Sequence, residues 1–522
     1  MIALALLMQS AVGQELPVLP IEAAAFETDW AAVSGEWKAA EGQLEQTRTG
    51  GMGLAFRKAP AYGDVRFEAE FNPLPEGNGV RAAIVACRSI GSQSFYFAHF
   101  DSRNSQVILV RSDRRESWNE ITRRTGVSIP AGEWSKGEIR CQGNRLSVFL
   151  NGQQVLEATD DALNAGVVGL GTSQGHVLFR NLRAGGEEAD LEGGWHMEKA
   201  RHLVVCSDAG AGGYEAFPDV VRLQNGDLLC VMYAGYGHVS LPNEALPKGG
   251  RVCAVRSRDN GETWSAAEVV YDDEADNRDP HIAQLADGTL LCTFFSLTTK
   301  ADGRYELLGT HLVRSLDGGK TWEKQAITIN DTYACSAPVR EQPDGSLVLG
   351  LYYENREVGA WGAVTISQDK GLTWSAPIDI GRKSGHYHDA ETDTCRLANG
   401  DLLAVMRPCM CYAKSSDGGR TWRPSQPIGF EGHAPYLLRT SSGVLLLAHR
   451  LPGTALHYST DEGRTWHGPV PIDTVGGAYP SLCELPDRRI FCVYYEEGEG
   501  SDIRGVWLRA EATGVEVLSR DG

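Results

Sequence analysis

The stretch Ser257-Arg258-Asp259-Asn260-Gly261-Glu262-Thr263-Trp264 has the pattern Ser-x-Asp-x-Gly-x-Thr-Trp, and this pattern decides the fold. It occurs five times, beginning at Ser257, Ser315, Ser367, Ser415 and Ser459. The spacings of 58, 52, 48 and 44 residues suit one four-stranded sheet per repeat. In each copy the aspartate can accept backbone hydrogen bonds, the glycine permits a positive φ, and the tryptophan can pack between sheets. The motif therefore predicts a repeated turn with a structural role.

A second repeated feature is a hairpin bend in which a glycine stands two residues before a leucine. Five such bends begin at Gly226, Gly288, Gly345, Gly400 and Gly443, and Arg488 takes the place of the glycine in a sixth. Six hairpins with five copies of the turn motif predict a six-bladed β-propeller over residues 200–515. We expect the segment 201–206 to close the ring by pairing with the last blade, because closure removes exposed sheet edges.

Residues 20–185 precede the repeats and alternate polar and apolar side chains in short runs, as at 65–71 and 145–150. An Asn151-Gly152 turn follows the second run, and no helical period is evident. The alternation predicts an all-β sandwich. The order of its runs resembles concanavalin- or laminin-G-like domains, some of which bind glycans while others only pack. Residues 186–199 are predicted to form a linker.

Composition and the chain ends limit the classes of partner. The chain of 522 residues has a formal net charge of −19, which disfavours general binding to nucleic acid or anionic membranes. Residues 1–13 begin with an apolar run and end in small residues, so we expect a signal peptide and a secreted, periplasmic or extracellular protein. No later stretch approaches the roughly 18 apolar residues of a membrane span.

The 12 cysteines are placed more like buried thiols than like a disulfide framework. Cys230, Cys292 and Cys492 occupy the same place in three repeated strands, where a thiol acts as a small apolar side chain. Cys409 and Cys411 could instead pair within a loop. Two cysteines alone do not make a metal site, and no metal or other cofactor is expected.

Candidate functional residues come from aligning the repeats at the mouth of the central channel, where the innermost strands of a propeller converge. A proline seven or eight residues before the bend marks this level in five blades, and Thr392 stands there in the fourth. The residue just before this position is, in blade order, Phe217, Asp279, Ala337, Glu391, Ala434 and Tyr479. A position with only a packing role would stay apolar, so we interpret Asp279, Glu391 and Tyr479 as parts of one functional site.

The far end of each hairpin gives a second set. Seven residues after the bend, four blades carry an aromatic residue, whereas blades four and five carry Arg407 and Arg450. Surface salt bridges would explain one arginine. Two neighbours at a matched position favour a fork that binds a carboxylate or sulfate.

With these residues the chain resembles sialidases, in which the repeated turn is known as the Asp box. That family binds the sugar carboxylate with three arginines, attacks with a tyrosine partnered by a glutamate, and uses an aspartate as acid/base. The resemblance implies that Tyr479 is the nucleophile, Glu391 its partner, and Arg407 and Arg450 two arms of the clamp. A phenol suits an anionic substrate because a charged nucleophile would be repelled.

The sequence departs from the family at the first arginine. The first-blade motif is Glu215-Ala216-Phe217-Pro218, so Ala216 replaces that arginine. Arg278 occupies the same repeat position in blade two, where it could replace the missing arm or support Asp279. Residues 235–242, where the acid/base of the family is expected, contain no aspartate. We therefore assign the acid/base role to Asp279, with Asp219 in reserve.

Four histidines, His281, His386, His388 and His433, fall near the starts of the inner strands. Together they could bind sugar hydroxyls, supply an acid or base near neutral pH, or ligate a metal. Their spacing does not fit a zinc motif. We assign His281, His388 and His433, with Arg278 and Asp219, to substrate binding.

The sequence thus predicts a secreted, retaining exo-glycosidase of the sialidase-like class that removes a terminal, acidic sugar from a glycan. Loss of one arginine arm should cost about 1.5–3 kcal/mol of binding, enough to redirect the substrate. The main alternative is a catalytically silent, lectin-like propeller. A structural cell-surface propeller, and a lyase or other glycosidase with His388 or His281 as base, also fit the fold.

Overall fold

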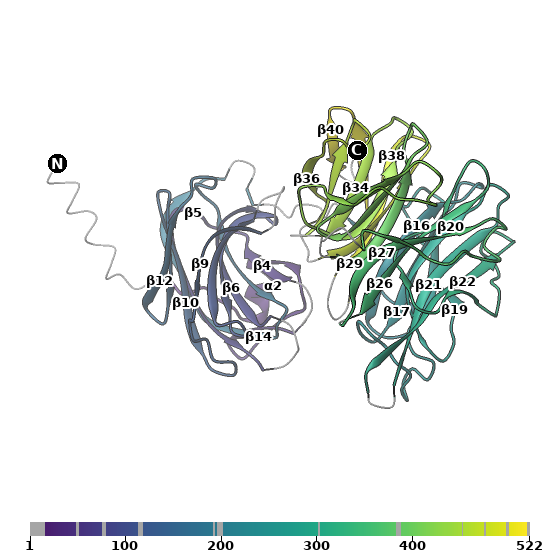
Figure 1. The fold of residues 1–522 in the computed structure, drawn as a ribbon. Helices are drawn as coiled ribbons and strands as arrows, with labels where there is room; N and C mark the ends of the chain where they lie inside the picture. Colours follow the sequence, from purple (N-terminus) through teal and green to yellow (C-terminus); the bar gives the residue numbers. More distant parts are fainter. Residues whose placement is uncertain are drawn as a thin grey trace. The chain divides into compact units, whose positions relative to one another are not determined.

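The computed structural model describes residues 16–518, except 48–51, 76–79, 113–117, 192–193, 196–201, 301–302, 356, 383–387, 451–452, 474–476 and 497–500. The expected signal peptide, residues 1–13, lies outside this range. The regular secondary structure of the described chain is almost wholly β-strand, with the short helix α2 (Ala23–Asp29). It divides into two compact units, Met1–Lys199 and Ala200–Gly522 (Figure 1). None of the described helices is long and apolar enough to cross a membrane.

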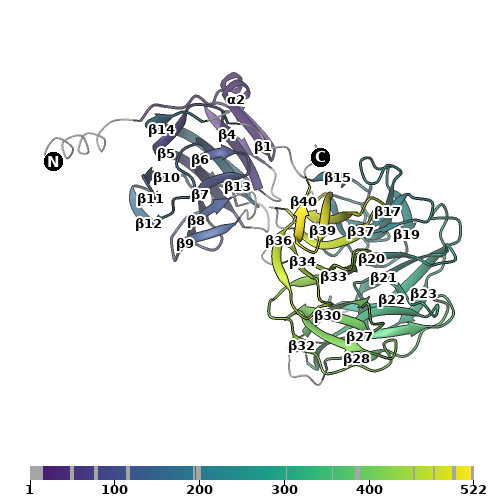
Figure 2. The same ribbon diagram turned by 90° about the horizontal axis from the view of Figure 1, so that it is seen from above.

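The first unit is a sandwich of two seven-stranded antiparallel sheets (Figure 2). One sheet has the order β12 (Gln153–Thr159), β11 (Arg145–Leu150), β10 (Ser135–Gln142), β5 (Ala61–Pro73), β14 (Val177–Ala189), β3 (Gln43–Gln46) and β2 (Trp37–Ala40). The other has the order β1 (Trp30–Ser34), β4 (Met52–Arg57), β13 (Val167–Ser173), β6 (Ala82–Gly91), β7 (Ser94–Asp101), β8 (Gln106–Ser112) and β9 (Asn119–Thr125). This confirms the predicted β-sandwich.

Side chains at alternating strand positions fill the sandwich core. Phe71 on β5 and Phe100 on β7 come from opposite sheets, and their ring centroids lie 5.0 Å apart. One boundary of the sequence analysis is wrong. β14 continues to Ala189, which pairs with Ala61 of β5, so the first residues of the expected linker 186–199 belong to the sandwich.

The second unit contains six sheets, which are the six predicted blades. Blade one comprises β16 (Tyr214–Arg222), β17 (Leu228–Gly235), β18 (Arg251–Ser257) and β19 (Glu268–Tyr271). Blade two comprises β20 (Asp276–Gln284), β21 (Leu290–Thr299), β22 (Tyr305–Ser315) and β23 (Ile327–Asn330). Blade three comprises β24 (Ala334–Cys335), β25 (Arg340–Glu341), β26 (Leu347–Asn355), β27 (Gly359–Ser367) and β28 (Ile378–Ile380). Blades four and five are β29 (His388–Arg396), β30 (Leu402–Pro408), β31 (Cys411–Ser415) and β32 (Gln426–Pro427); and β33 (His433–Arg439), β34 (Leu445–Arg450), β35 (Thr454–Ser459) and β36 (His467–Pro471).

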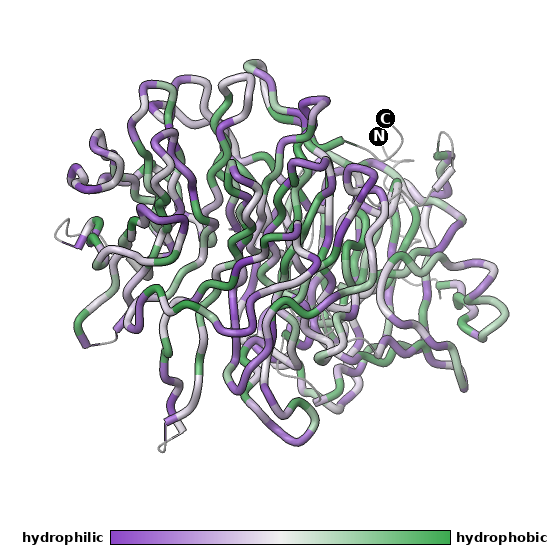
Figure 3. The backbone as a smooth tube through the Cα atoms, turned by 90° about the vertical axis from the view of Figure 1, so that its right-hand side faces the viewer, coloured by the Kyte–Doolittle hydropathy of each residue, from purple (hydrophilic) through white to green (hydrophobic). Residues whose placement is uncertain are grey.

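The sixth blade closes the ring as predicted. It comprises β37 (Gly477–Glu484), β38 (Arg489–Glu496) and β39 (Ile503–Glu511), with β40 (Gly514–Val517) paired to β39. Its last strand, β15 (Leu203–Cys206), comes from the start of the unit and pairs antiparallel with β39. Apolar segments run along the interior strands, whereas polar segments are frequent in the outer loops (Figure 3). The propeller is thus held by packing between blades and by closure of the ring.

Each Asp box is a self-contained turn. In the first copy Asp259 Oδ1 accepts hydrogen bonds from the Ser257 hydroxyl at 2.8 Å and from the Thr263 amide at 2.9 Å. The indole of Trp264 donates to the Gly261 carbonyl at 3.0 Å and packs against the core between the first and sixth blades. The motif therefore has a structural role.

Candidate active site

The first strands of four blades share a local distortion at the mouth of the channel. Phe217, Asp279, Ala434 and Tyr479 all have φ between 47° and 52°, and the strand register shifts at each of them. A positive φ costs a non-glycine residue on the order of 1 kcal/mol. Because Phe217 and Ala434 adopt it as well, the distortion belongs to the fold. It takes the residue before each proline out of the strand ladder.

The result is a contact between blades four and six. The hydroxyl of Tyr479, on β37, donates a hydrogen bond to Oε1 of Glu391, on β29. Arg407 on β30 places its Nη1 3.1 Å from the same oxygen. The other oxygen, Oε2, accepts the amide of Ala434 at 3.0 Å. Glu391 is 1% exposed, so its carboxylate is held on both sides by protein donors.

The electrostatics of this contact keep Tyr479 protonated. Burial, together with the negative charges of Glu391 and Asp279, raises the pKa of Tyr479 well above its ordinary value, and Arg407 opposes the shift. A free phenolate is therefore not formed near neutral pH. The phenol can act as a nucleophile only if a base removes its proton during attack, and Glu391 is in hydrogen-bond contact to do so.

Asp279 presents a carboxyl of different character. It is 2% exposed; Oδ2 accepts the hydroxyl of Ser336 at 3.2 Å, whereas Oδ1 has no hydrogen-bond partner among the described residues. Burial raises the pKa of Asp279 to about 6; the guanidinium of Arg278 opposes this shift and Glu391 adds to it. A buried carboxyl with a pKa near neutral and one oxygen without a described hydrogen bond suits a general acid and base.

Arg278 supports Asp279 more than it replaces the missing arginine. Its guanidinium is 3.8 Å from Asp276 and 3.9 Å from Asp279, and it donates to the His238 carbonyl. It also lies over the ring of Phe217 at 5.0 Å. Arg278 is 5% exposed and faces two carboxylates, so its charge is compensated within the protein.

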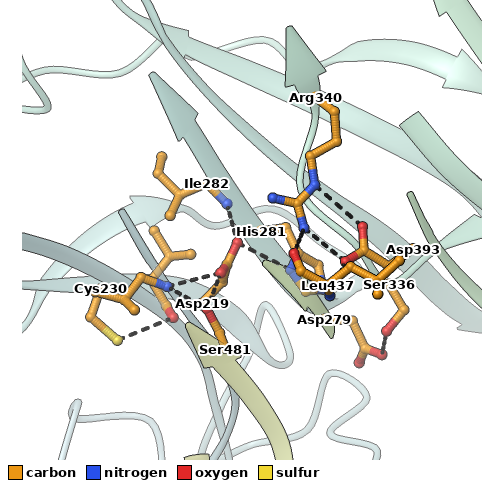
Figure 4. A network of polar contacts seen from close by, with 12 residues as sticks. Asp219, Cys230, Asp279, His281, Ile282, Ser336, Arg340, Asp393, Leu437 and Ser481 are labelled. Carbon is orange, nitrogen blue, oxygen red and sulfur yellow. Dashed lines mark hydrogen bonds and ion pairs between the residues drawn. The ribbon is translucent and has the colours of Figure 1, made fainter. Parts of the chain in front are cut away.

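The prediction that Asp219 binds substrate is wrong. It has no exposed surface, and its carboxylate accepts hydrogen bonds from Ser481, His281 and the amides of Val220 and Ile282 (Figure 4). Burial alone would raise the pKa of Asp219, but these hydrogen bonds outweigh burial and lower it. All of its acceptor capacity serves contacts between blades one, two and six.

The other predicted residues are placed as follows. Arg450 ends β34 and pairs in register with His433 of β33, both half-buried. His281 is buried and bound to Asp219 at 3.1 Å. His388 begins β29, but its side chain and all of His386 lie outside the described part of the structure. Among the described residues, no three His, Cys, Asp or Glu side chains cluster as metal ligands would.

Two contacts of the site were not predicted, and one pairing was left open by the sequence. Ser336 contacts Asp279, and Tyr352 is close enough for Asp279 and Glu391 to influence its pKa, which burial chiefly raises. Tyr352 belongs to the aromatic set at the far end of the hairpins, which the sequence analysis treated as background. Cys409 and Cys411 form a disulfide directly after Arg407-Pro408. This is the loop pairing that the sequence left open for these two cysteines, and their spacing was the signal.

Comparisons with known proteins agree with this architecture. Residues 248–492 match the BNR repeat-like domain, and residues 24–184 match the 3-keto-alpha-glucoside-1,2-lyase-like domain. The chain is 26% identical over 358 residues to a sialidase of Micromonospora viridifaciens, covering 57% of this chain and 53% of that protein. It is 23% identical over 239 residues to a sialidase of Clostridium perfringens, covering 38% and 62%.

The curated relatives are therefore matched over only part of their length. Among solved structures, a Hadza microbial sialidase is similar in fold, with a TM-score of 0.50 and 15% identity over 88% of this chain and 95% of that one. The chain thus carries a sialidase-like, BNR-repeat six-bladed β-propeller, preceded by a concanavalin-like β-sandwich.

Proposed function

We propose that the propeller is a retaining exo-glycosidase that hydrolyses a terminal acidic sugar from a glycan. The observation that carries the proposal is the contact of Tyr479 and Arg407 with one oxygen of Glu391. The hydroxyl of the nucleophile and a cation thereby lie within hydrogen-bond distance of one oxygen of the base. Such a cluster is expected where charge changes during a reaction and has no evident role in a structural propeller.

The shared oxygen also indicates the kind of sugar. Arg407 lies 3.1 Å from Glu391 Oε1, which Tyr479 also contacts, so an anion on Arg407 would sit close to the carbon that Tyr479 attacks. A carboxylate attached directly to the anomeric carbon meets this requirement better than one across the ring. We therefore propose an ulosonic acid, the class that includes sialic acid, as the terminal residue.

The steps follow from the positions of the protons. The phenol oxygen of Tyr479 bonds to the anomeric carbon while its proton passes to Glu391. Asp279 gives its proton to the departing glycosidic oxygen as that bond breaks. In the second half, the Asp279 carboxylate removes a proton from water, whose oxygen attacks the anomeric carbon. The bond to Tyr479 then breaks, and the phenol recovers its proton from Glu391.

We also propose that the protein is located outside the cytoplasm. The Cys409–Cys411 disulfide lies in the hairpin between β30 and β31. Structural disulfides persist in oxidising compartments and are rare in the cytosol. The disulfide and the apolar start of the sequence both favour an exported protein.

The test is release of fluorophore from an aryl α-sialoside by the native protein, Tyr479→Phe and Tyr271→Phe. The control change also removes a hydroxyl bonded to a carboxylate, here Asp273 at 3.0 Å on the outermost strand of blade one. We expect turnover in the native protein and the control and its loss in Tyr479→Phe. Full activity in Tyr479→Phe would reject the nucleophile. Inactivity of all three proteins on a panel of acidic sugars would favour a lectin-like propeller.

A further inference from the structure

Two cysteines meet in the core of the β-sandwich. Cys87 lies on β6 and Cys141 on β10, which are strands of opposite sheets (Figure 2). Neither side chain has exposed surface, and both belong to the apolar core between the sheets. Their Sγ atoms are 3.1 Å apart. The contact joins residues 54 positions apart in the sequence, so the fold itself brings the two thiols together.

The distance between the sulfur atoms is short for two thiols. Non-bonded carbon atoms attract each other best at about 3.5–4.0 Å, and sulfur is a larger atom than carbon. The two sulfur atoms therefore lie closer together than packing alone favours. A disulfide bond is about 2.05 Å long, so an approach of about 1 Å is enough to form it.

A buried arginine fixes the backbone around this pair. Arg88 follows Cys87 on β6 and is 1% exposed. Its guanidinium donates to the carbonyls of Gly63 at 2.8 Å, Gly143 at 2.8 Å and Leu163 at 3.0 Å. Gly143 stands two residues after Cys141, so one of these bonds connects the neighbours of the two cysteines across the sandwich. The two strands are thus held at the spacing at which the thiols meet.

Buried thiols of the propeller are placed differently. Cys230 and Cys492 occupy equivalent strand positions, and each donates to the carbonyl of the residue that follows it, at 3.7 and 3.8 Å. Within the described part of the chain, no contact like that of Cys87 and Cys141 joins two other free cysteines. The pair in the sandwich therefore differs from the thiols that serve as small apolar side chains.

We propose that Cys87 and Cys141 form a disulfide that joins the two sheets of the sandwich. The buried-thiol interpretation of the sequence then fails for this pair. The inference does not depend on the chemistry of the propeller. It requires an oxidising compartment, in which structural disulfides persist, and so agrees with the proposed export of the protein.

The oxidant is an external disulfide. The thiolate of one cysteine attacks it, and one external thiolate leaves and takes up a proton. The thiolate of the second cysteine then displaces the other external thiol from the mixed disulfide. Two protein thiols are thereby oxidised to one disulfide, and one external disulfide is reduced to two thiols. Because both side chains are buried and burial raises the pKa of Cys87 well above its ordinary value, these steps belong to folding, before the sheets close.

The first experiment maps the bond. The full chain is unfolded in reductant, refolded in a mixture of reduced and oxidised glutathione, denatured, alkylated and digested without reduction. Mass spectrometry should find the Cys87 and Cys141 peptides linked, and Cys230 and Cys492 alkylated as internal controls. Alkylation of both Cys87 and Cys141, a mixed disulfide with glutathione on either, or a link from either to a different cysteine would overturn the proposal. If the chain does not refold, the same map is made of protein exported to a bacterial periplasm.

The second experiment measures what the bond does. Hydrogen exchange in β6 and β10 is compared between full chains refolded with and without reductant. Exchange should be faster in reductant by up to about a thousandfold, because closing a loop of this length lowers the equilibrium constant for unfolding by about that factor.

The matched variants separate this bond from the Cys409–Cys411 disulfide, which reductant also removes. Cys230→Ala alters a buried thiol outside the pair and should keep the full response to reductant, whereas Cys87→Ala should show none. An equal response in Cys87→Ala and the native protein would overturn the proposal. If Cys87→Ala does not fold, Cys141→Ala removes the same bond.

Discussion

Arg407 Nη1 lies 3.1 Å from Oε1 of Glu391, the oxygen that also accepts the hydroxyl of Tyr479. The glutamate is thus shared between an arginine on its own blade and a tyrosine two blades away. Removing either partner changes the environment of the other. Mutations at these three positions should therefore be non-additive, which distinguishes them from residues that only touch a ligand.

Asp279→Asn should stabilise the protein at neutral pH. Folding raises the pKa of Asp279 from 3.8 to about 6, so the native state binds this proton more tightly than the unfolded chain. The stability that this tighter proton binding adds is present below about pH 4 and is lost as the pH rises through 6. A shift of about two units corresponds to about 3 kcal/mol. Asparagine carries no charge, so the unfolding free energy of the variant should match the native value near pH 4 and exceed it at pH 8.

Urea unfolding at both pH values measures this effect, with Asp461→Asn as a control of opposite sign. Burial would raise the pKa of Asp461, but bonds to Thr465 and Ser459 in its Asp box lower it to about 2. That variant should lose stability at neutral pH. A native-like or lower stability of Asp279→Asn at pH 8 would show that burial of this carboxylate carries no penalty.

Arg450→Gln should weaken binding of an anionic sugar more than it slows the chemical step. Arg450 is half-buried at the end of β34, whereas Arg407 is also paired with Glu391, the proposed base. Loss of one charge-assisted hydrogen bond of about 1.5–3 kcal/mol raises KM about tenfold to a hundredfold. Arg407→Gln should lower kcat as well. Steady-state kinetics separates the two effects, with the exposed Arg464→Gln as control. An unchanged KM in Arg450→Gln would remove it from the site.

Replacing Cys409 and Cys411 by serine should have a modest cost in stability and a specific cost in binding. The disulfide closes a three-residue turn, for which loop-closure entropy gives about 1.5 kcal/mol. Because the turn begins two residues after Arg407, KM for an anionic substrate should rise. Cys395→Ser, which alters a free and partly exposed thiol, should change neither quantity. Equal KM values for all three proteins would show that the turn does not position Arg407.

Much of the fold could be predicted from the sequence because it depends on interactions between neighbouring residues. The Asp boxes and hairpin bends depend on neighbouring residues, so their sequence determines their conformation wherever they occur. Aligning the repeats on their prolines also brought Asp279, Glu391 and Tyr479 to one level. In the structure Tyr479 bonds to Glu391, and Asp279 lies close enough for its charge to raise the pKa of Tyr479.

What was missed depends on contacts between distant segments. Asp219 looks like a free carboxylate in the sequence, but Ser481 and His281 reach it from two other blades. From the sequence, Arg278 could replace the missing arginine of the carboxylate clamp, but in the structure Asp276 and Asp279 compensate its charge. No repeat alignment reports whether a charge already has a partner. Such assignments need the positions of side chains from several blades at once.

The central claim is that Tyr479 forms the covalent bond to the sugar. A fluorinated sialosyl fluoride, which forms a glycosyl-enzyme faster than water releases it, tests this directly when the protein is digested and analysed by mass spectrometry. We expect one sugar adduct on the peptide that contains Tyr479, and none in Tyr479→Phe. Turnover of the substrate without an adduct, or an adduct on Glu391 or another residue, would contradict it.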